Sequence, residues 1–141
     1  MDLTTLSPVE VLALTIYGES RGEPIQGQVA VGNVIKNRTG GGRSIVQVCL
    51  APDQFSCWDK SDPNYKILID YAGRLVNDEL LQDRYFDQCY FVAEGIIDGK
   101  LLDNTQGAKN YVTTDLQKSG KGPVWADKFT LVIGSQVFGT A

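Results

Sequence analysis

Two predicted helices meet at the stretch Tyr17–Pro24, and this junction constrains the fold more than any other part of the chain. Two acids, one arginine and two glycines fall within these eight positions. A strong helical pattern runs up to the stretch, where one of the glycines is expected to end the helix, and Pro24 disfavours helical geometry at Glu23. We therefore expect Glu19 in the last turn of the first helix and Glu23 just before the second.

Glu19 is the best candidate for an acid catalyst by its position. Its carboxyl would lie at the negative end of a helix dipole, which favours the neutral form and suits a general acid in a groove. Arg21 is a candidate for binding an anionic substrate group. The plainer interpretation is a charged turn, in which Arg21 forms a surface salt bridge worth about 0–1 kcal/mol.

Helix signals continue along the chain. Ser7, Pro8 and Glu10 predict a capping box at the start of the first helix. The other helices are predicted over residues 24–38, 44–50, 61–76 and from 79 or 82 to 98. The helix over 24–38 is apolar on most of its surface and is expected to be the central buried one. Gly32 within it costs about 1 kcal/mol relative to Ala, so we expect a close helix crossing there.

The C-terminal third changes character. Short strands are predicted over residues 110–113, 130–133 and 136–138. The last two flank Gly134-Ser135, a two-residue hairpin signal. Residues 116–122 are polar and rich in Gly and Lys, which predicts an exposed loop. The fold class expected is therefore α+β and mostly helical, in one domain over residues 1–141 with a small C-terminal β-hairpin or sheet.

The chain contains no histidine. This excludes Ser-His-Asp and Cys-His catalysis and His-ligated zinc. Cys49, Cys57 and Cys89 fit no zinc spacing and are expected to be buried thiols, with a Cys49–Cys57 disulfide left open. We therefore expect no metal and no cofactor.

Charge and hydropathy limit the possible partners. The net charge is −4, which argues against non-specific binding to nucleic acid. No apolar run approaches the roughly 20 residues of a membrane span, so no membrane insertion is expected. The segment Met1–Leu6 has neither a basic nor an apolar stretch, so no signal peptide is expected.

Several polar residues outside the first junction are candidates for contacting a sugar. Gln54, Ser56 and Tyr111 stand among apolar residues and carry groups that can donate to hydroxyls or amides. Trp58 has two interpretations, because an indole can stack on a sugar ring or fill a core.

Three blocks of the sequence, taken together, indicate a protein family. They are residues 17–24 with 27–31 and Asn37-Arg38, then residues 54–58, and finally residues 133–138. Together they resemble the catalytic domain of spore cortex-lytic enzymes and related bacterial and phage cell-wall hydrolases. The resemblance spans nearly the whole chain, and its first block is the most specific.

The resemblance implies a lysozyme-like fold, as in lytic transglycosylases, and cleavage of peptidoglycan glycan strands at N-acetylmuramic acid. It implies that Glu19 is the catalytic acid. We predict a lytic transglycosylase that leaves 1,6-anhydro ends, with Glu19 as general acid and then base. The residues expected to bind substrate are Arg21, Gln54, Ser56 and Tyr111. Tyr17 and Glu23 are expected to be structural, with Glu23 bonded to backbone N–H groups near the start of the second helix.

Two other functions stay open. The first is a muramidase that hydrolyses the glycan with a second carboxylate, for which Asp53, Asp59 and Asp62 are the candidates. The second is an inactive cell-wall binding or virion structural module. The chain also departs from the family pattern, because Gln136 stands where the family commonly has histidine and a histidine often found near Tyr111 is missing.

The expected site of action is the cell wall. Without a signal peptide, the sequence favours a phage protein that reaches the periplasm or the outside through a holin or with the virion. Virion or tail proteins would then be further partners.

Overall fold

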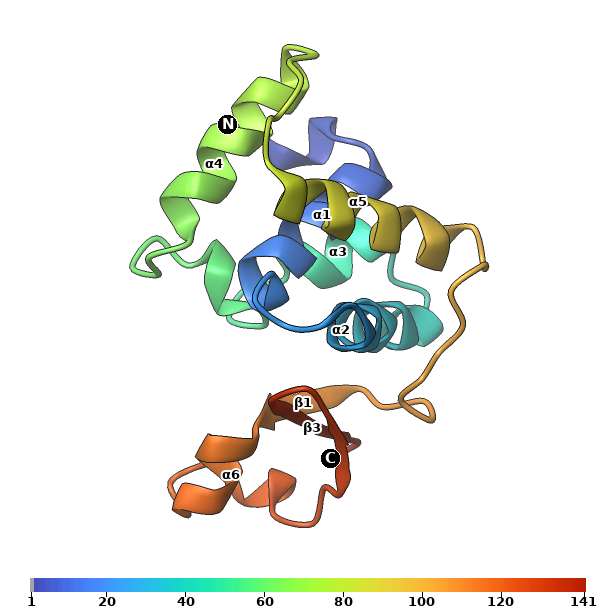
Figure 1. The fold of residues 1–141 in the computed structure, drawn as a ribbon, viewed down its shortest axis with the longest axis vertical. Coiled ribbons are helices and arrows are strands. Elements are labelled where there is room, and N and C mark those ends of the chain that lie inside the picture. The colour runs from blue at the N-terminus through green and yellow to red at the C-terminus, as the bar shows by residue number, and fades with distance from the viewer. Residues whose placement is uncertain (1) are drawn as a thin grey trace.

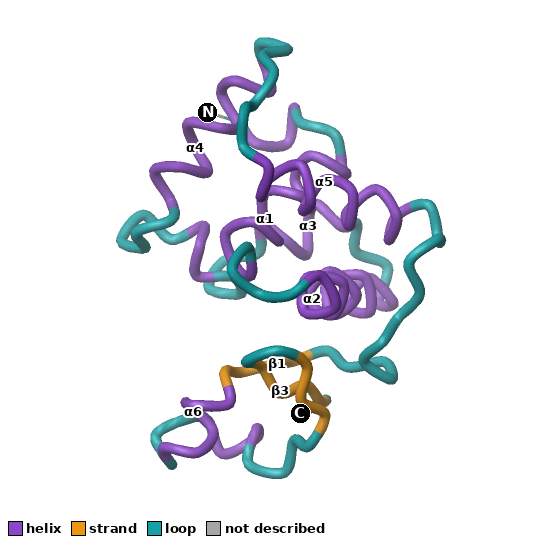
Figure 2. The backbone as a smooth tube through the Cα atoms, viewed as in Figure 1, coloured by secondary structure: helices purple, strands orange, loops and turns teal. Residues whose placement is uncertain are grey.

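The computed structural model describes residues 2–141. Its helices are α1 (Pro8–Ser20), α2 (Ile25–Arg38), α3 (Ile45–Leu50), α4 (Tyr65–Val76), α5 (Arg84–Ile97) and α6 (Thr114–Ser119). Its strands are β1 (Asn110–Thr113), β2 (Leu131–Ile133) and β3 (Gln136–Gly139). Helices α1 to α5 form one body, and the strands with α6 lie below α2 in Figures 1 and 2. The predicted fold class, α+β and mostly helical with a small C-terminal sheet, is confirmed.

Helix α1 begins as predicted. The Ser7 hydroxyl accepts a hydrogen bond from the Glu10 N–H at 3.2 Å, and the Ser7 N–H donates to the Glu10 carboxylate at 2.9 Å. This reciprocal pair satisfies two donors at the start of the helix. The helix ends at Ser20 with Arg21 as its C-cap, so Gly18 lies inside the last turn and Gly22 directly follows the cap.

Helix α1, and not α2, is the central helix. Every side chain from Val11 to Tyr17 is buried, and α1 packs against α2, α3, α4 and α5. The prediction that α2 is the central helix was wrong, although residues Gly27–Ile35 of α2 are buried. Its apolar surface is covered by α1 and α5 on one side and by the C-terminal strands on the other (Figure 1).

The close helix crossing expected at Gly32 is present. A Cβ atom at Gly32 would lie 2.3 Å from Cδ1 of Ile96 on α5 and 3.1 Å from Cδ1 of Ile16 on α1. Side chains never approach so closely, so α2 can reach both neighbours only without a side chain here.

The carboxylate of Asp83 forms hydrogen bonds with three helices, α1, α4 and α5. Its carboxylate caps α5 through the N–H groups of Tyr85 and Phe86, and it accepts hydrogen bonds from the hydroxyls of Tyr17 on α1 (2.5 Å) and Tyr71 on α4 (2.6 Å). Burial pushes the pKa of Asp83 upward, but these hydrogen bonds outweigh burial and hold the pKa below its ordinary value. The ionised carboxylate is therefore the form that stabilises the fold.

Asp83→Asn is expected to lower the free energy of unfolding by about 1–3 kcal/mol at pH 7, because the amide cannot accept all of these bonds. A carboxyl with a lowered folded pKa stabilises the protein above its unfolded pKa of about 3.9 and loses that effect as the pH falls through the folded value. Denaturant unfolding of both proteins at pH 7 and near pH 3 measures this. A difference between them that stays constant over this range would contradict the assignment.

The C-terminal strands form an antiparallel sheet in the order β1-β3-β2. The predicted hairpin at Gly134-Ser135 is present, and Gly134 adopts a φ of 61° that favours glycine. The loop predicted over residues 116–122 is wrong in its first half. Thr113 caps α6 by accepting from the Leu116 N–H at 3.1 Å, and Gly120 ends the helix at a φ of 73°.

The two faces of the sheet pack against different parts of the protein. Tyr111 and Phe138 are paired across β1 and β3 and face the helical core. Val112 and Val137, on the opposite face, form a small second core with Ala126. The alternation of the strands therefore turns Tyr111 toward the helical body. None of the helices in residues 2–141 has the length and apolar character needed to cross a membrane.

Candidate active site

Glu19 lies where three parts of the chain converge. It is in the last turn of α1, as predicted. Its Oε1 accepts a hydrogen bond from the Tyr111 hydroxyl on β1 at 2.8 Å, and its Oε2 accepts one from the backbone N–H of Cys57 at 3.2 Å. The carboxylate is therefore fixed at both oxygens, and each oxygen keeps a second lone pair for a proton or a substrate.

Tyr111 is suited to be a permanent donor to Glu19. Burial and the neighbouring Glu19 carboxylate both raise the pKa of the Tyr111 hydroxyl well above its ordinary value. The phenol therefore stays protonated over the working range of an enzyme and always presents its proton to Glu19. The sequence placed Tyr111 among the substrate-binding residues, whereas the structure gives it a direct contact with the acid.

Two hollows meet at Glu19. The first has a volume of about 520 Å³ and includes Gln54, Ser56 and Tyr111 in its walls. The second has a volume of about 400 Å³ and includes Arg21 and Glu23. The residues predicted to bind substrate thus all line a hollow that contains Glu19.

Arg21 is held at the edge of its hollow by neutral oxygens. It donates to the carbonyl of Tyr17 at 3.2 Å and to Oδ1 of Asn64 at 2.7 Å, and its guanidinium lies 4.7 Å from the centre of the Tyr17 ring. These contacts fix the guanidinium without neutralising its charge. Arg21 therefore remains able to bind an anion.

Arg38 is a site residue that the sequence reasoning missed. It lines the 520 Å³ hollow with Glu19, and its guanidinium lies 5.1 Å from the centre of the Phe55 ring. It donates to the Lys109 carbonyl at 2.7 Å and to Oε1 of Gln54 at 3.3 Å. The signal was present, since Asn37-Arg38 is part of the first resembling block. Through these two hydrogen bonds, Arg38 connects Gln54 in the wall of the hollow with Lys109, the residue before β1.

Glu23 is expected to be structural, and the partner predicted for it, the N–H groups near the start of α2, was wrong. Its two oxygens accept from the N–H and the hydroxyl of Ser135 at 2.8 and 2.6 Å. It therefore anchors the β2–β3 hairpin and not the start of α2. A Cβ at Gly134 would lie 2.5 Å from Oε1 of Glu23, so this contact also requires a glycine in the turn.

Tyr17 and Trp58 both serve the core beside the site. Tyr17 is buried and donates to Asp83, as described above. The indole of Trp58 packs against the helical core and donates to the Thr15 hydroxyl at 3.0 Å. Of the two interpretations of Trp58, the core one is confirmed.

A family model described as cell wall hydrolase matches residues 22–139. The chain belongs to this family. The catalytic domain of the SleB protein of Bacillus cereus is similar in structure, with a TM-score of 0.65 and 24% identity over 94% of this chain and 89% of that one. The catalytic domain of the germination-specific lytic transglycosylase SleB of Bacillus anthracis has a TM-score of 0.63 and 25% identity over 94% and 93% of the two chains. Comparison with curated protein sequences gives no match.

These likenesses confirm the family and the fold that the three sequence blocks predicted. The cell wall hydrolase match begins at residue 22, so Glu19 lies just before it. The expected phage origin is not tested by the comparisons and stays a prediction.

Gln136 is the most unusual polar residue of this cell wall hydrolase. It is 95% buried on β3 and lines the 400 Å³ hollow with Glu19. Within residues 2–141 its Oε1 has no hydrogen-bond partner. A buried acceptor that stays unpaired costs about 1–3 kcal/mol.

The candidate second carboxylates differ in position. Asp53 and Asp59 line the 520 Å³ hollow that contains Glu19. Asp62 instead accepts a hydrogen bond from the Asn64 N–H at 2.8 Å, at the start of α4. Of these three aspartates, Asp53 and Asp59 share a hollow with Glu19 and Asp62 does not.

The three cysteines are buried free thiols, so the predicted thiols are confirmed and the Cys49–Cys57 disulfide is not formed. Burial raises the pKa of Cys49 and of Cys89 to about 12. Such thiols are inert as nucleophiles at neutral pH. Among residues 2–141 no group of three acids or cysteines is placed to hold a metal ion.

Proposed function

We propose that the protein cleaves peptidoglycan glycan strands at N-acetylmuramic acid as a lytic transglycosylase, with Glu19 as general acid and then base. The observation that carries the proposal is the position of Glu19, fixed by Tyr111 and Cys57 at the junction of two hollows. Membership of the cell wall hydrolase family supports the substrate. The name of the Bacillus anthracis relative supports the reaction type.

The reaction needs one carboxyl group. Protonated Glu19 gives its proton to the glycosidic oxygen, and the bond from that oxygen to C1 of the muramic residue breaks. The acetamido group of the sugar can stabilise C1 at this stage. The C6 hydroxyl of the same sugar then attacks C1 while its proton passes to the Glu19 carboxylate. The product is a 1,6-anhydro sugar, Glu19 is protonated again, and no water is consumed.

The hydrogen bonds to Glu19 support both proton transfers by keeping the carboxylate from rotating between them. The attacking hydroxyl is already held beside C1, and such intramolecular reactions have high effective concentrations.

Hydrolysis is the second candidate because Asp53 and Asp59 line the same hollow as Glu19. A retaining hydrolase needs a second carboxylate about 5–5.5 Å from the acid, and an inverting one needs it about 6.5–9.5 Å away. Glu23, whose two oxygens accept from Ser135, is expected to be structural and not the second carboxylate. We favour the transglycosylase because it needs no activated water.

Product analysis separates the two reactions. Purified peptidoglycan is digested in heavy-oxygen water, and the new glycan ends are identified by mass spectrometry. We expect 1,6-anhydromuramic ends that contain no heavy oxygen, while an authentic muramidase digested in parallel gives reducing ends that carry it. Reducing, labelled ends from this protein would overturn the transglycosylase assignment and would direct mutagenesis to Asp53 and Asp59.

A further inference from the structure

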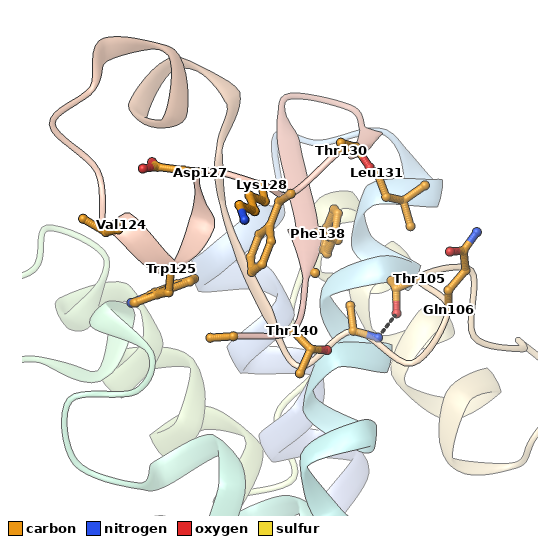
Figure 3. Close-up of a pocket in the computed structure, with 14 residues that line it drawn as sticks. Thr105, Gln106, Val124, Trp125, Asp127, Lys128, Thr130, Leu131, Phe138 and Thr140 are labelled. Atoms are coloured by element: carbon orange, nitrogen blue, oxygen red, sulfur yellow. Dashed lines mark hydrogen bonds between the residues drawn. The ribbon is translucent and has the colours of Figure 1, made fainter.

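A third hollow lies on the C-terminal part of the protein and has no part in the proposed mechanism. Its volume is about 620 Å³, and Figure 3 shows the residues that line it. Its walls come from the segment 124–131, the end of β3 with the residues after it, and the loop that holds Thr105. The small sheet thus contributes residues both to the Glu19 hollows and to this hollow.

Trp125 connects this hollow to the active site. It is a lining residue of both the 620 Å³ hollow and the 520 Å³ hollow that contains Glu19. The residue is 45% exposed, although tryptophan is costly to leave in water. The two hollows are therefore neighbours that share one aromatic wall.

The Trp125 ring is held in place before any ligand binds. It packs on Phe129 with ring centres 5.7 Å apart. The Gln117 amide on α6 donates to the carbonyls of Ala126 and Phe129 at 2.7 and 2.8 Å, and Ala126 is buried in the small core. The segment that carries Trp125 is thus fixed directly after the indole, and a fixed aromatic surface binds at low entropic cost.

The lining of the hollow suits a carbohydrate. Phe138 and Leu131 provide apolar surface, while Thr130, Thr140 and Lys128 place polar groups around it (Figure 3). Apolar surface with a few polar groups is typical of small-molecule sites, and a sugar offers both an apolar ring face and hydroxyls. Asp127 and Lys128 add one carboxylate and one ammonium group, which can bind sugar hydroxyls and amides.

We propose that the glycan strand continues from the Glu19 cleft across the Trp125 ring into the 620 Å³ hollow, which binds a further N-acetyl sugar away from the cleaved bond. This subsite rests on the proposed function, because it assigns the same strand to both hollows. It makes Trp125 a binding residue that selects long strands over short fragments.

The test compares substrates of different length. Trp125→Ala is expected to lower kcat/KM on long glycan strands by about tenfold, mainly through KM, as truncating a well-packed aromatic at a binding surface does. It should leave the slower cleavage of a tetrasaccharide unchanged, because so short a fragment need not reach the second hollow. Trp125→Phe should recover most of the loss. Phe91→Ala is the matched control, since Phe91 is 60% exposed on α5 and lines none of the three hollows.

A binding measurement provides a second readout that does not depend on turnover. In the Glu19→Gln background, an octasaccharide of the glycan is expected to change the indole emission, and the change should be smaller when Trp125→Phe is added, which leaves Trp58 as the remaining indole. Equal losses on long and short substrates, or an emission change that Trp125→Phe leaves undiminished, would overturn the subsite alone. Wild-type protein that cleaves neither substrate would overturn the proposed function, and the subsite with it.

Discussion

Glu19→Gln is expected to reduce glycan cleavage by roughly 10²–10⁴-fold, the usual contribution of a positioned acid or base. The amide has nearly the same shape but no proton to give to the glycosidic oxygen. It also has one acceptor oxygen where the carboxylate has two, so either the Tyr111 hydroxyl or the Cys57 N–H loses its partner. The cost in stability should be about 1 kcal/mol, which leaves the protein folded.

Glu23→Gln is the matched control for this experiment. It is the same chemical change four residues away, on a glutamate whose two oxygens are also occupied. Because those bonds hold the β2–β3 hairpin, the change should lower the melting temperature more than the activity per folded molecule. Turbidity clearing of cell walls, with folding followed by circular dichroism, measures both. A folded Glu19→Gln protein that clears walls at nearly the wild-type rate would contradict the assignment of Glu19 as the acid. An inactive but stable Glu23→Gln protein would indicate that Glu23 is a second catalytic carboxylate.

The local parts of this fold could be read from the sequence because they depend on short-range chemistry. The Ser7–Glu10 capping box, the interruption at Pro24 and the hairpin at Gly134-Ser135 each involve residues within a few positions of one another. The position of Glu19 at the end of α1 followed from the same signals. The α6 helix was missed because its start depends on one threonine cap and its composition resembles a loop.

The parts that could not be read are those that join distant segments. Tyr111 lies 92 positions from Glu19, and Ser135 lies 112 positions from Glu23. No spacing rule connects such pairs, so the sequence could name Tyr111 as a polar candidate but could not place it on the acid. The sequence did not single out Trp125 either. The residue lines two hollows that are formed by distant segments, and no spacing rule predicts them. The position of Glu19 and the resemblance together named it as the candidate acid, and only the folded chain supplied its partners.

Gly18→Ala is expected to lower the free energy of unfolding by about 1–3 kcal/mol, the usual cost of overpacking a core. The added Cβ would lie 2.6 Å from Cβ of Cys57, 2.8 Å from its Sγ and 2.9 Å from Cδ1 of Leu68. The Cβ of Cys57 is bonded directly to the main chain and cannot rotate away. The short 3₁₀ helix Ser56–Trp58 must therefore move off α1.

This movement should also reach the chemistry, because the Cys57 N–H is one of the two groups that hold Glu19. A displacement of the acid by a fraction of an ångström to 1 Å costs about 10- to 100-fold in rate. Gly22→Ala is the control within the same stretch, since a methyl there would have no contact within 4 Å and should leave the melting temperature nearly unchanged. Thermal unfolding and initial rates on purified peptidoglycan give the two readouts. If Gly18→Ala keeps both its melting temperature and its rate, α1 and the Cys57 segment can separate freely, and Glu19 must then be held by Tyr111 alone.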